Sequence, residues 1–587
     1  MAQSKPYSHD DDSWFSDEQL AKCRSAEYEV ESSPVPTRMV SNGEYLPLPQ
    51  TEQQKRVEAR TFELVDSAAK KLGVSRRQFL GGSGGMAASF IAMNDVFGRF
   101  FNVTPAEMFE PAAFAENGPP VNLFVFDDQT HLVRSRLANP RSLRAIAQGP
   151  GSASTAAGWT ANPFNPLGEL DERGSPWTPW NPELGQTPNV GSEFHLEKYI
   201  ERMYFQSQTT VALLSNVTPG TIALPDEPAP RPPRTIAESL SGAILTAEQT
   251  VAVREFVNRI ARSTRLLAHG LLYPGVGNLE YMQYQINNYH PDAWKGYNIN
   301  RAAKVDTNPE SDMRRWRLDD EQVAYPTYEL IVKNAQELEQ HPGFFNICVH
   351  KGLSTNAGPE PELGHPIDIP KAATDWPELN FVIYHSCIRP GFWNFNALQD
   401  VRSGRMREGV PDILWTTEFA VLSAPFPNVY AEIGTTWASS VVTFPTVAAH
   451  IMGQLMKFMG PERIIFGSDS LWYGSPQWQI EAMWRFSIPD EMRQQYGYPQ
   501  LTQPAKRKIL GLNAARLYGI PAAAEGAGRG AYRPVPTNFS ALIPNTLKTL
   551  LEFPGYTADN MSKLRLRYAE LGGTRSNTRY GWVRTKV

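Results

Sequence analysis

The sequence predicts an α/β fold, a closed (β/α)₈ barrel of about 400 residues with insertions, between residues 116 and 520. Eight short apolar runs alternate from Val121 onward with stretches of helical periodicity, which is typical of a parallel sheet with crossover helices. Several of these runs end in polar residues, and barrel enzymes build their active sites at the carboxyl ends of the strands. The chain has 587 residues, and a barrel with insertions can reach beyond ~400 residues as one domain, so a second globular domain is not required.

The eight runs are rich in Val, Ile, Leu, Phe and Tyr, which favours strands. They are VNLFVFD (121–127), TTVALLS (209–215), RLLAHGLLYP (265–274), AWKGYNI (293–299), FNICVHKG (345–352), NFVIYHS (380–386), NVYAEIG (428–434) and RIIFGSD (463–469). Helical patterns lie between several of them, as in 247–263 and 325–340. The loop at about 135–200 is rich in Pro, Gly, Trp and Asn and is long enough for a lid or for a contact in a homo-oligomer.

Composition excludes several classes of partner. The chain is 41% hydrophobic and 20% charged with a formal net charge of -5, so it lacks the basic excess of a nucleic-acid-binding protein. Its three cysteines are too few for a disulfide framework or a cysteine-rich zinc site. No apolar run reaches the ~18 to 20 residues of a membrane-spanning helix. These observations leave a small molecule as the expected partner.

The two ends of the chain differ from the barrel in composition and in hydrophobic pattern. Residues 1–74 are polar, with an acidic cluster at 10–12, and are predicted to be a mobile leader. Residues 521–587 are irregular and end in a basic tail. We expect this C-terminal extension to wrap around the barrel, which occupies 116–520.

The segment 75–115 begins with Ser75, Arg76 and Arg77 and continues into a Gly- and Ala-rich apolar stretch. It resembles a twin-arginine export signal, in which a cationic start precedes an apolar region too short to remain as a membrane span. An A-x-A site ends at Ala115. The resemblance implies a periplasmic or secreted protein. The alternative is an N-terminal helix capped by Ser75 in a cytoplasmic protein.

Candidate site residues lie where the apolar runs end. The first run is followed by Gln129 and His131, the fifth ends at His350, the sixth at His385 and the eighth at Asp469. Residues two apart on a strand point the same way, so Gln129 and His131 could share one metal ion. Zinc accepts imidazole and carboxylate together, and a catalytic site leaves one position for water or substrate.

This set of strand ends resembles the amidohydrolase-related family, which includes aminocarboxymuconate semialdehyde decarboxylase. In chain order, the corresponding residues are Asp127, Gln129 and His131 at the D-x-H-x-H motif of the first strand, then His350, His385 and Asp469. The closing segment KILGLNAARLYGI (508–520) resembles the helix that ends such barrels. The resemblance implies a divalent metal, with zinc as the expected ion, held by His131, His350, Asp469 and Gln129.

One position departs from the family pattern. Gln129 stands where the family usually has its first ligand histidine, and an amide oxygen is a neutral, poorer ligand for zinc. Gln129 therefore binds metal through its carbonyl, hydrogen-bonds a metal-bound water, or marks a site that works with little metal. The neighbouring Asp128 is expected to point to the opposite face of the strand.

Three further polar residues have two interpretations each. Lys351 either neutralises a substrate carboxylate or extends to solvent. Glu432 either hydrogen-bonds a ligand histidine or is a solvated charge. His269 either reaches the cavity or belongs to the core.

The favoured reaction is metal-assisted hydrolysis of a small amide, ester or lactone, with Asp469 moving protons and His385 steadying the developing oxyanion. Non-oxidative decarboxylation of a small carboxylic acid is the second hypothesis, since it needs the same groups. The third is a binding barrel without catalysis.

Overall fold

The computed structural model describes residues 33–37, 50–120, 123–132, 194, 196–217, 235–243, 245–261, 264–298, 316–337, 342–352, 363–389 and 393–520. Most of the loop predicted at 135–200, and the C-terminal extension at 521–587, lie outside these residues.

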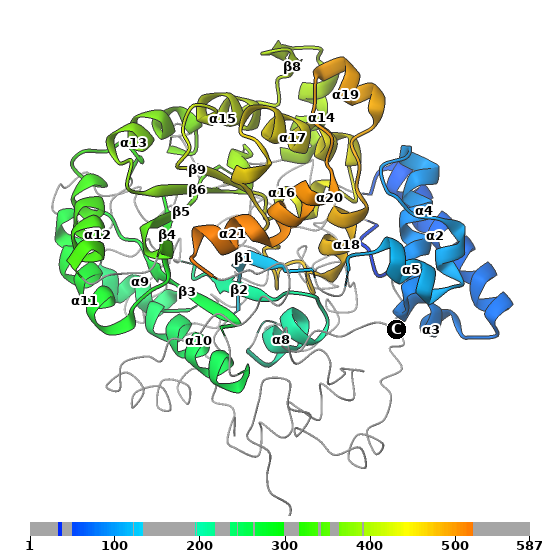
Figure 1. The fold of residues 1–587 in the computed structure, drawn as a ribbon, viewed down its shortest axis with the longest axis horizontal. Helices are drawn as coiled ribbons and strands as arrows, with labels where there is room; N and C mark the ends of the chain where they lie inside the picture. Colours follow the sequence, from blue (N-terminus) through cyan, green and yellow to red (C-terminus); the bar gives the residue numbers. More distant parts are fainter. Residues whose placement is uncertain are drawn as a thin grey trace, which may run out of the picture.

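The core of the molecule is a ring of eight parallel strands (Figure 1). They are β1 (Phe126–Thr130), β2 (Val211–Leu214), β3 (Leu266–Leu271), β4 (Ala293–Tyr297), β5 (Asn346–His350), β6 (Asn380–Tyr384), β9 (Val429–Glu432) and β10 (Ile464–Ile465). They pair in that order. Each coincides with one of the eight apolar runs, so the predicted barrel is confirmed.

Backbone hydrogen bonds between β1 and the segment after β10 close the ring. Asp128 N–H donates to the carbonyl of Phe466 at 3.0 Å, and Asp469 N–H donates to the carbonyl of Gln129 at 2.9 Å. A parallel bridge between Thr130 and Ser470 continues this pairing. Closure leaves no free sheet edge and brings the ends of the first and last strands together.

Apolar side chains fill the end of the barrel interior that helix α21 (Asn513–Leu517) closes. They come from alternate positions of the strands and include Phe126, Leu213, Leu267, Cys348 and Val382. This short helix packs on them and crosses the middle of the ring in Figure 1. With one end closed by α21, the carboxyl ends of the strands remain for function.

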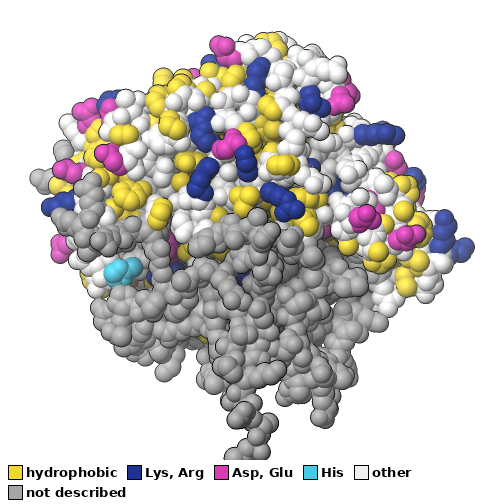
Figure 2. Space-filling model, in the orientation of Figure 1, with side chains coloured by type: hydrophobic (Ala, Val, Ile, Leu, Met, Phe, Trp, Pro, Cys, Tyr) yellow, Lys and Arg dark blue, Asp and Glu magenta, His cyan; other side chains and the backbone are white. Residues whose placement is uncertain are grey.

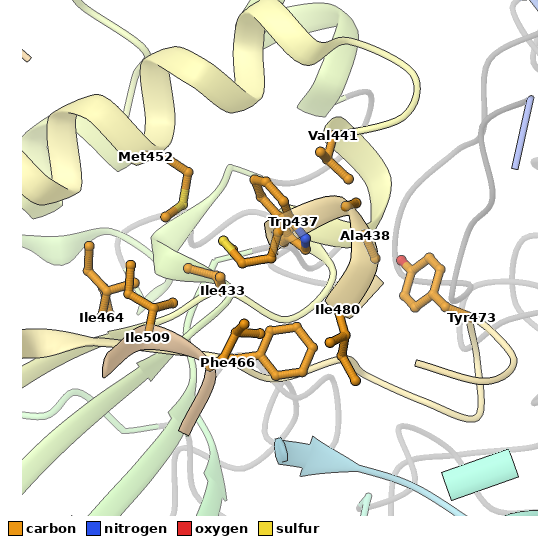
Figure 3. Packing of buried hydrophobic residues seen from close by; sticks show 14 of the residues in the cluster. Ile433, Trp437, Ala438, Val441, Met452, Ile464, Phe466, Tyr473, Ile480 and Ile509 are labelled. Atoms are coloured by element: carbon orange, nitrogen blue, oxygen red, sulfur yellow. The ribbon is translucent and has the colours of Figure 1, made fainter. Parts of the chain in front are cut away.

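Helices surround the ring. They are α8 (Leu196–Ile200), α9 (Ile236–Gly242), α10 (Ala247–Ala261), α11 (Leu279–Tyr289), α12 (Tyr325–Glu337), α13 (Ile369–Asp375), α14 (Trp393–Arg402), α15 (Thr416–Ser423), α16 (Thr436–Ser440), α17 (Pro445–Phe458), α18 (Gln477–Arg485), α19 (Asp490–Tyr496) and α20 (Gln503–Arg507). A two-stranded hairpin of β7 (Met406–Arg407) and β8 (Val410–Pro411) lies outside the barrel. Figure 3 shows how Trp437, Phe466 and Ile480 pack between the last strands and these helices.

Four N-terminal helices gather on one side of the barrel (Figure 1). They are α2 (Glu52–Leu72), α3 (Arg76–Gly81), α4 (Ser83–Phe97) and α5 (Pro111–Asn117). Helix α2 differs from the mobile leader expected there. A capping box between Thr51 and Gln54 starts it, and Val57, Thr61 and Val65 bury one side. Because the polar residue Thr61 lies in that buried stripe, the hydrophobicity pattern does not show the helical period.

Helix α3 carries the arginine pair. Ser75 caps it in a capping box with Gln78, as in the helical alternative of the sequence analysis. The guanidinium of Arg76 lies 4.2 Å from the ring centroid of Phe62 and 3.5 Å from the carboxylate of Asp66. Export and cleavage after Ala115 stay predictions.

The N-terminal helices dock on α18 through a buried ion pair. Arg485 Nη1 contacts Glu107 Oε2 at 2.6 Å, and both side chains are fully buried. Arg485 also bonds Glu481 and the carbonyls of Asn102 and Phe114. This segment is therefore integrated with the barrel.

Acidic and basic side chains are interspersed on the described part of the face shown in Figure 2. None of the helices in the described part of the chain combines the length and hydropathy needed to cross a bilayer.

Candidate metal centre

The strand ends adopt backbone conformations that L-residues rarely take. His385, Ser386, Thr435 and Asp469 have φ values of 65°, 48°, 56° and 56°. Such left-handed residues cost roughly 1–3 kcal/mol each and cluster at functional sites. Here they end β6, β9 and β10 and turn side chains from all three strands toward one region.

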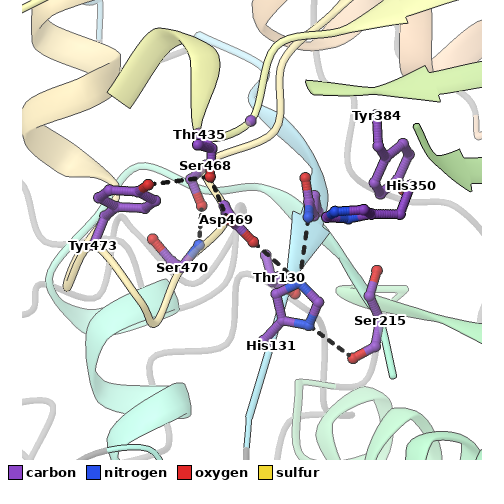
Figure 4. A network of polar contacts seen from close by, with 12 residues as sticks. Thr130, His131, Ser215, His350, Tyr384, Thr435, Ser468, Asp469, Ser470 and Tyr473 are labelled. Atoms are coloured by element: carbon purple, nitrogen blue, oxygen red, sulfur yellow. Dashed lines mark hydrogen bonds and ion pairs between the residues drawn. The ribbon is translucent and has the colours of Figure 1, made fainter. Parts of the chain in front are cut away.

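His131 and Asp469 form the centre of that region (Figure 4). Nε2 of His131 lies 3.1 Å from Oδ1 of Asp469, and both side chains are buried. The other ring nitrogen, Nδ1, lies 3.2 Å from the carbonyl oxygen of Ser215. A carbonyl only accepts, so in the neutral ring the proton is on Nδ1 and Nε2 holds a lone pair toward the carboxylate.

A hydrogen-bond chain holds Asp469 from the opposite side. Tyr473 donates to Thr435 at 3.1 Å, and Thr435 donates to Oδ2 of Asp469 at 2.5 Å. Burial alone raises the pKa of Asp469, but when Nε2 of His131 is protonated as well, its hydrogen bond and charge, with smaller effects of His385 and Thr435, outweigh the effect of burial and hold the pKa at about 2. Asp469 is therefore ionised throughout the neutral range.

Gln129 lies beside this pair on the same side of β1 as His131, as the two-residue spacing predicts. Its Nε2 lies 3.4 Å from Nε2 of His131. Its Oε1 is buried and has no hydrogen-bond partner among the described residues. A Cβ at Gly434 would come within 2.5 Å of that oxygen, so the glycine provides the room that Gln129 occupies.

His350 and His385 form a second pair. His385 Nδ1 lies 2.9 Å from the carbonyl oxygen of Gly434, so it carries the ring proton, and its Nε2 accepts from His350 Nδ1 at 3.0 Å. With the protons placed in this way, Nε2 is the nitrogen of His350 that carries the lone pair. Burial lowers the pKa of His385 to about 4 and that of His350 well below its usual value, so both rings are neutral and suited to bind metal.

Glu432 holds the end of β6 in place. It is fully buried, and its carboxylate accepts from His385 N–H at 3.0 Å and from Gly434 N–H at 2.5 Å. The interpretation of Glu432 as a solvated charge is wrong, and it bonds the backbone of a site histidine instead of the ring. Gly467 permits this approach, because a Cβ there would lie 2.0 Å from Glu432 Oε1.

Two other predictions need correction. Lys351 neither faces a substrate nor extends to solvent, because it is fully buried in an ion pair with Asp368 at 2.9 Å. Asp128 does not point away from the site side of β1. Its carboxyl group lies near the hydroxyls of Tyr384 and Tyr518 inside the barrel. The register of β1 shifts between Asp127 and Thr130, so simple alternation fails there.

Several groups that border the site were not predicted from the sequence. Thr435 and Ser215 follow their strands without any distinctive pattern. Lys295 does stand out, since a lysine within the apolar run AWKGYNI is unusual for a buried strand. Asp127, the first residue of the motif, accepts from Ser468 N–H at 2.8 Å and so holds the turn that carries Asp469.

The donor set at the strand ends fits a divalent ion. A lone-pair nitrogen and a carboxylate oxygen face each other at 3.1 Å, and two acceptors at that distance require a cation between them, either a proton or a metal. The unpartnered Oε1 of Gln129 adds a third acceptor when its amide rotates by half a turn, since the two ends of an amide are nearly equivalent in shape. His131, Asp469 and Gln129 therefore fit a metal.

Among the predicted ligands, His350 has the position that is least suited to binding the ion. In the part of the chain described, no three His, Cys, Asp or Glu side chains gather around one point as a metal site. His350 points toward the region of His131 in Figure 4, but its Nδ1 bonds His385. Coordination by His350 would therefore use Nε2, with His385 as the partner that fixes its ring.

A protein family model matches part of this chain. The matched family is Amidohydrolase, over residues 301–520. The match contains His350, His385 and Asp469 but begins after β4, so Gln129 and His131 lie outside it. No curated protein sequence matches the chain.

Solved structures of barrel proteins are similar at low identity. An uncharacterised TIM-barrel protein from Bordetella bronchiseptica is 14% identical, with 68% of this chain and 99% of that chain covered and a TM-score of 0.36. A 5-carboxyvanillate decarboxylase from Novosphingobium aromaticivorans, with bound manganese, is 12% identical over 68% and 99% with a TM-score of 0.33. A probable 2-pyrone-4,6-dicarboxylic acid hydrolase from Acinetobacter baumannii is 9% identical over 67% and 99% with a TM-score of 0.33.

Proposed function

We propose that this protein is a divalent-metal-dependent hydrolase that acts on a small amide, ester or lactone at the carboxyl ends of the barrel strands. The observation that carries the proposal is the approach of Nε2 of His131 to Oδ1 of Asp469, with the unpartnered oxygen of Gln129 beside them. His131, Asp469 and Gln129 would hold the ion, with His350 as a further ligand. Zinc suits imidazole and carboxylate together. When bound, such an ion lowers the pKa of a coordinated water and polarises a carbonyl.

The residues of the chain supply the proton transfers. Asp469 is ionised and accepts a proton from the attacking water as the water oxygen bonds the carbonyl carbon. The bond to the leaving nitrogen or oxygen then breaks, and Asp469 returns the proton to that atom. Thr435 and Tyr473 keep the carboxylate oriented during both transfers.

His385 is placed to orient His350, and its expected role at the oxyanion stays a prediction. Both of its ring nitrogens are engaged, one with Gly434 and the other with His350, so it orients His350 in this conformation. It would reach a developing oxyanion only after its bond to His350 opens.

The test uses His350→Ala and Asp469→Ala. Both variants are expected to lose turnover while keeping the fold, because residues at the carboxyl ends of barrel strands contribute to function more than to packing. The loss of His350 removes a neutral ligand, so excess zinc restores part of the activity. The loss of Asp469 also removes the proton acceptor, so excess zinc does not restore it.

The assay is a panel of amides, lactones and aromatic acids, with metal content and thermal melting measured on the same samples. Release of carbon dioxide from an acid, without hydrolysis of any amide or lactone, would replace hydrolysis with non-oxidative decarboxylation. Near-normal turnover in both variants would contradict the proposal. Metal-free protein that binds panel members without turnover would identify a binding barrel.

A further inference from the structure

Two consecutive residues of helix α18 hold the turn that carries Asp469. Trp478 and Gln479 lie in the first turn of this helix, and both side chains are buried. Each side chain donates a hydrogen bond to a backbone carbonyl, one just before Asp469 and the other at Tyr473. Neither residue takes part in the proposed reaction, so their contacts act on the backbone of the turn.

Gln479 fixes the peptide group between Ser468 and Asp469. Its Nε2 donates to the carbonyl oxygen of Ser468 at 2.9 Å. The N–H of the same peptide group belongs to Asp469 and donates to the carbonyl of Gln129 at 2.9 Å. A peptide group is planar, so hydrogen bonds at both of its edges oppose its rotation. Helix α18 on one side and β1 on the other therefore set the plane from which Asp469 continues.

This restraint matters because Asp469 has a φ of 56°. A residue other than glycine keeps such a left-handed conformation only where the surrounding structure over-determines it. When the peptide group is free to rotate, Asp469 can relax toward a negative φ. Its Oδ1 would then leave Nε2 of His131, which lies 3.1 Å away. The hydrogen bond of Gln479 thus acts on the carboxylate through the backbone.

Trp478 fixes the far end of the same turn. Its Nε1 donates to the carbonyl oxygen of Tyr473 at 3.2 Å. The hydroxyl of Tyr473 begins the hydrogen-bond chain that reaches Oδ2 of Asp469 through Thr435 (Figure 4). Trp478 therefore holds the backbone of the residue whose ring orients the carboxylate.

Helix α18 is itself bonded at two places. Trp437 on α16 donates from Nε1 to the carbonyl oxygen of Gln479 at 3.2 Å, and Thr435 is the residue that precedes α16. The helices that restrain Asp469 from two directions are thus bonded to each other. At the end of α18, the buried ion pair of Arg485 and Glu107 fixes the helix, so its first turn is a rigid support.

We infer that Gln479 and Trp478 are positioning residues, which hold Asp469 in the conformation that lets it serve as a metal ligand and proton acceptor. The inference rests on the proposed function for the role of Asp469. The conformation of Asp469 can be measured without metal and without substrate, so the two can fail separately.

The test removes one donor at a time from the full-length chain. Gln479→Met keeps the length of the side chain and deletes its amide, and Trp478→Phe keeps an aromatic ring and deletes the indole N–H. Crystal structures of the metal-free variants are expected to show Asp469 at a changed φ, with its carboxylate out of contact with His131. Zinc affinity, measured by competition with a chromophoric chelator, should fall by ~10- to 100-fold, as for other groups that orient a ligand.

The matched controls are Gln454→Met and Trp294→Phe. Both residues are fully buried, and each donates to a backbone carbonyl away from the strand ends. Gln454 donates to Pro411 on β8 at 2.8 Å, and Trp294 donates to Phe344 at 3.1 Å. Each control loses the same chemical group as its test variant, so the melting temperature should fall similarly. Zinc affinity and the conformation of Asp469 should stay as in the wild type.

The inference is overturned when Asp469 keeps its φ and its contact with His131 in both test variants, or when the controls lower zinc affinity as much as the test variants do. If only one test variant folds, that variant decides. A wild-type chain that binds no zinc would contradict the proposed function, whereas displacement of Asp469 in the metal-free variants would still support its positioning by Gln479 and Trp478.

Discussion

Two regions bury charged side chains but satisfy them differently. One is the contact between the N-terminal helices and α18, and the other is the proposed metal site at the strand ends. Around Arg485, every partner is an acceptor: Glu107, Glu481 and two backbone carbonyls. At the strand ends, the lone pair of His131 faces the carboxylate of Asp469, and Gln129 Oε1 has no hydrogen-bond partner among the described residues. A completed buried network stabilises a fold, whereas an incomplete one requires an explanation, such as an ion or a water.

The largest expected effect comes from removing the N-terminal helices. A chain that begins at Glu116 lacks many buried side chains of the main core, including Leu80, Phe90 and Phe101. Each contributes about 1.5–3 kcal/mol by burial, so these three alone are comparable with the ~5–15 kcal/mol stability of a typical protein. We expect this chain to aggregate, whereas one that begins at Ser33 and keeps every described residue folds normally.

The same experiment bears on the predicted signal. Cleavage after Ala115 would produce the chain that begins at Glu116, so a folded mature protein of that mass, with wild-type thermal stability, would show that the N-terminal helices are dispensable. Recovery of intact 75–115 in exported protein would instead show that the segment is retained.

A pair of isosteric substitutions tests the contrast between the two regions directly. Glu107→Gln removes one of the negative charges that balance the buried Arg485 and should lower the free energy of unfolding by about 3 kcal/mol. Any turnover by the folded protein should be unchanged. Asp469→Asn should abolish turnover with little loss of stability, because asparagine tolerates the positive φ of that position.

Denaturant unfolding and steady-state rates on both variants provide the measurements. Equal losses of stability would mean that Asp469 contributes to the fold as much as the ion pair of Arg485 does.

Gln129→His should give an intermediate effect at the metal centre. Imidazole is a better ligand for zinc than an amide, so metal affinity is expected to rise by roughly 10- to 100-fold. Competition with a chromophoric chelator measures it. Unchanged affinity would place Gln129 outside the coordination sphere, and Gln129→Ala serves as the control for simple loss of the amide.

The smallest expected effect concerns pH and a histidine that belongs to neither region. Burial lowers the pKa of His450 on α17 from 6.5 to about 4, so its neutral form is favoured in the folded state. Its contribution to stability is therefore complete above pH 6.5 and is lost as the pH falls through about 4. The free energy of unfolding should fall less between these pH values in His450→Gln than in the wild type. Parallel curves would contradict this.

Much of the barrel was predictable because its signals are local. Each strand is a short apolar run, and the eight runs match the eight strands. The side shared by Gln129 and His131 follows from the two-residue period. The same rule failed for Asp128, since a register shift in β1 depends on pairing with other strands and not on the run itself.

The N-terminal helices show the opposite situation. Helix α2 lies in a segment that was predicted as mobile because it is polar and lacks sustained periodicity, and Thr61 is one of the polar residues on its buried side. Its partner α4 was predicted as part of an export signal. Neither pattern reveals that the two segments cover each other's apolar surface, because contacts between separate helices leave no period in either one.

The sequence by itself determined which residues end the strands, since chain order and alternation decide that locally. Only the tertiary structure decided which of them meet. His131 and Asp469 are separated by most of the barrel along the chain, and they touch because β1 pairs with the segment after β10. The tertiary structure also decided the proton positions on His131, His350 and His385, because a neutral imidazole takes its tautomer from whichever carbonyl or ring the fold places beside it.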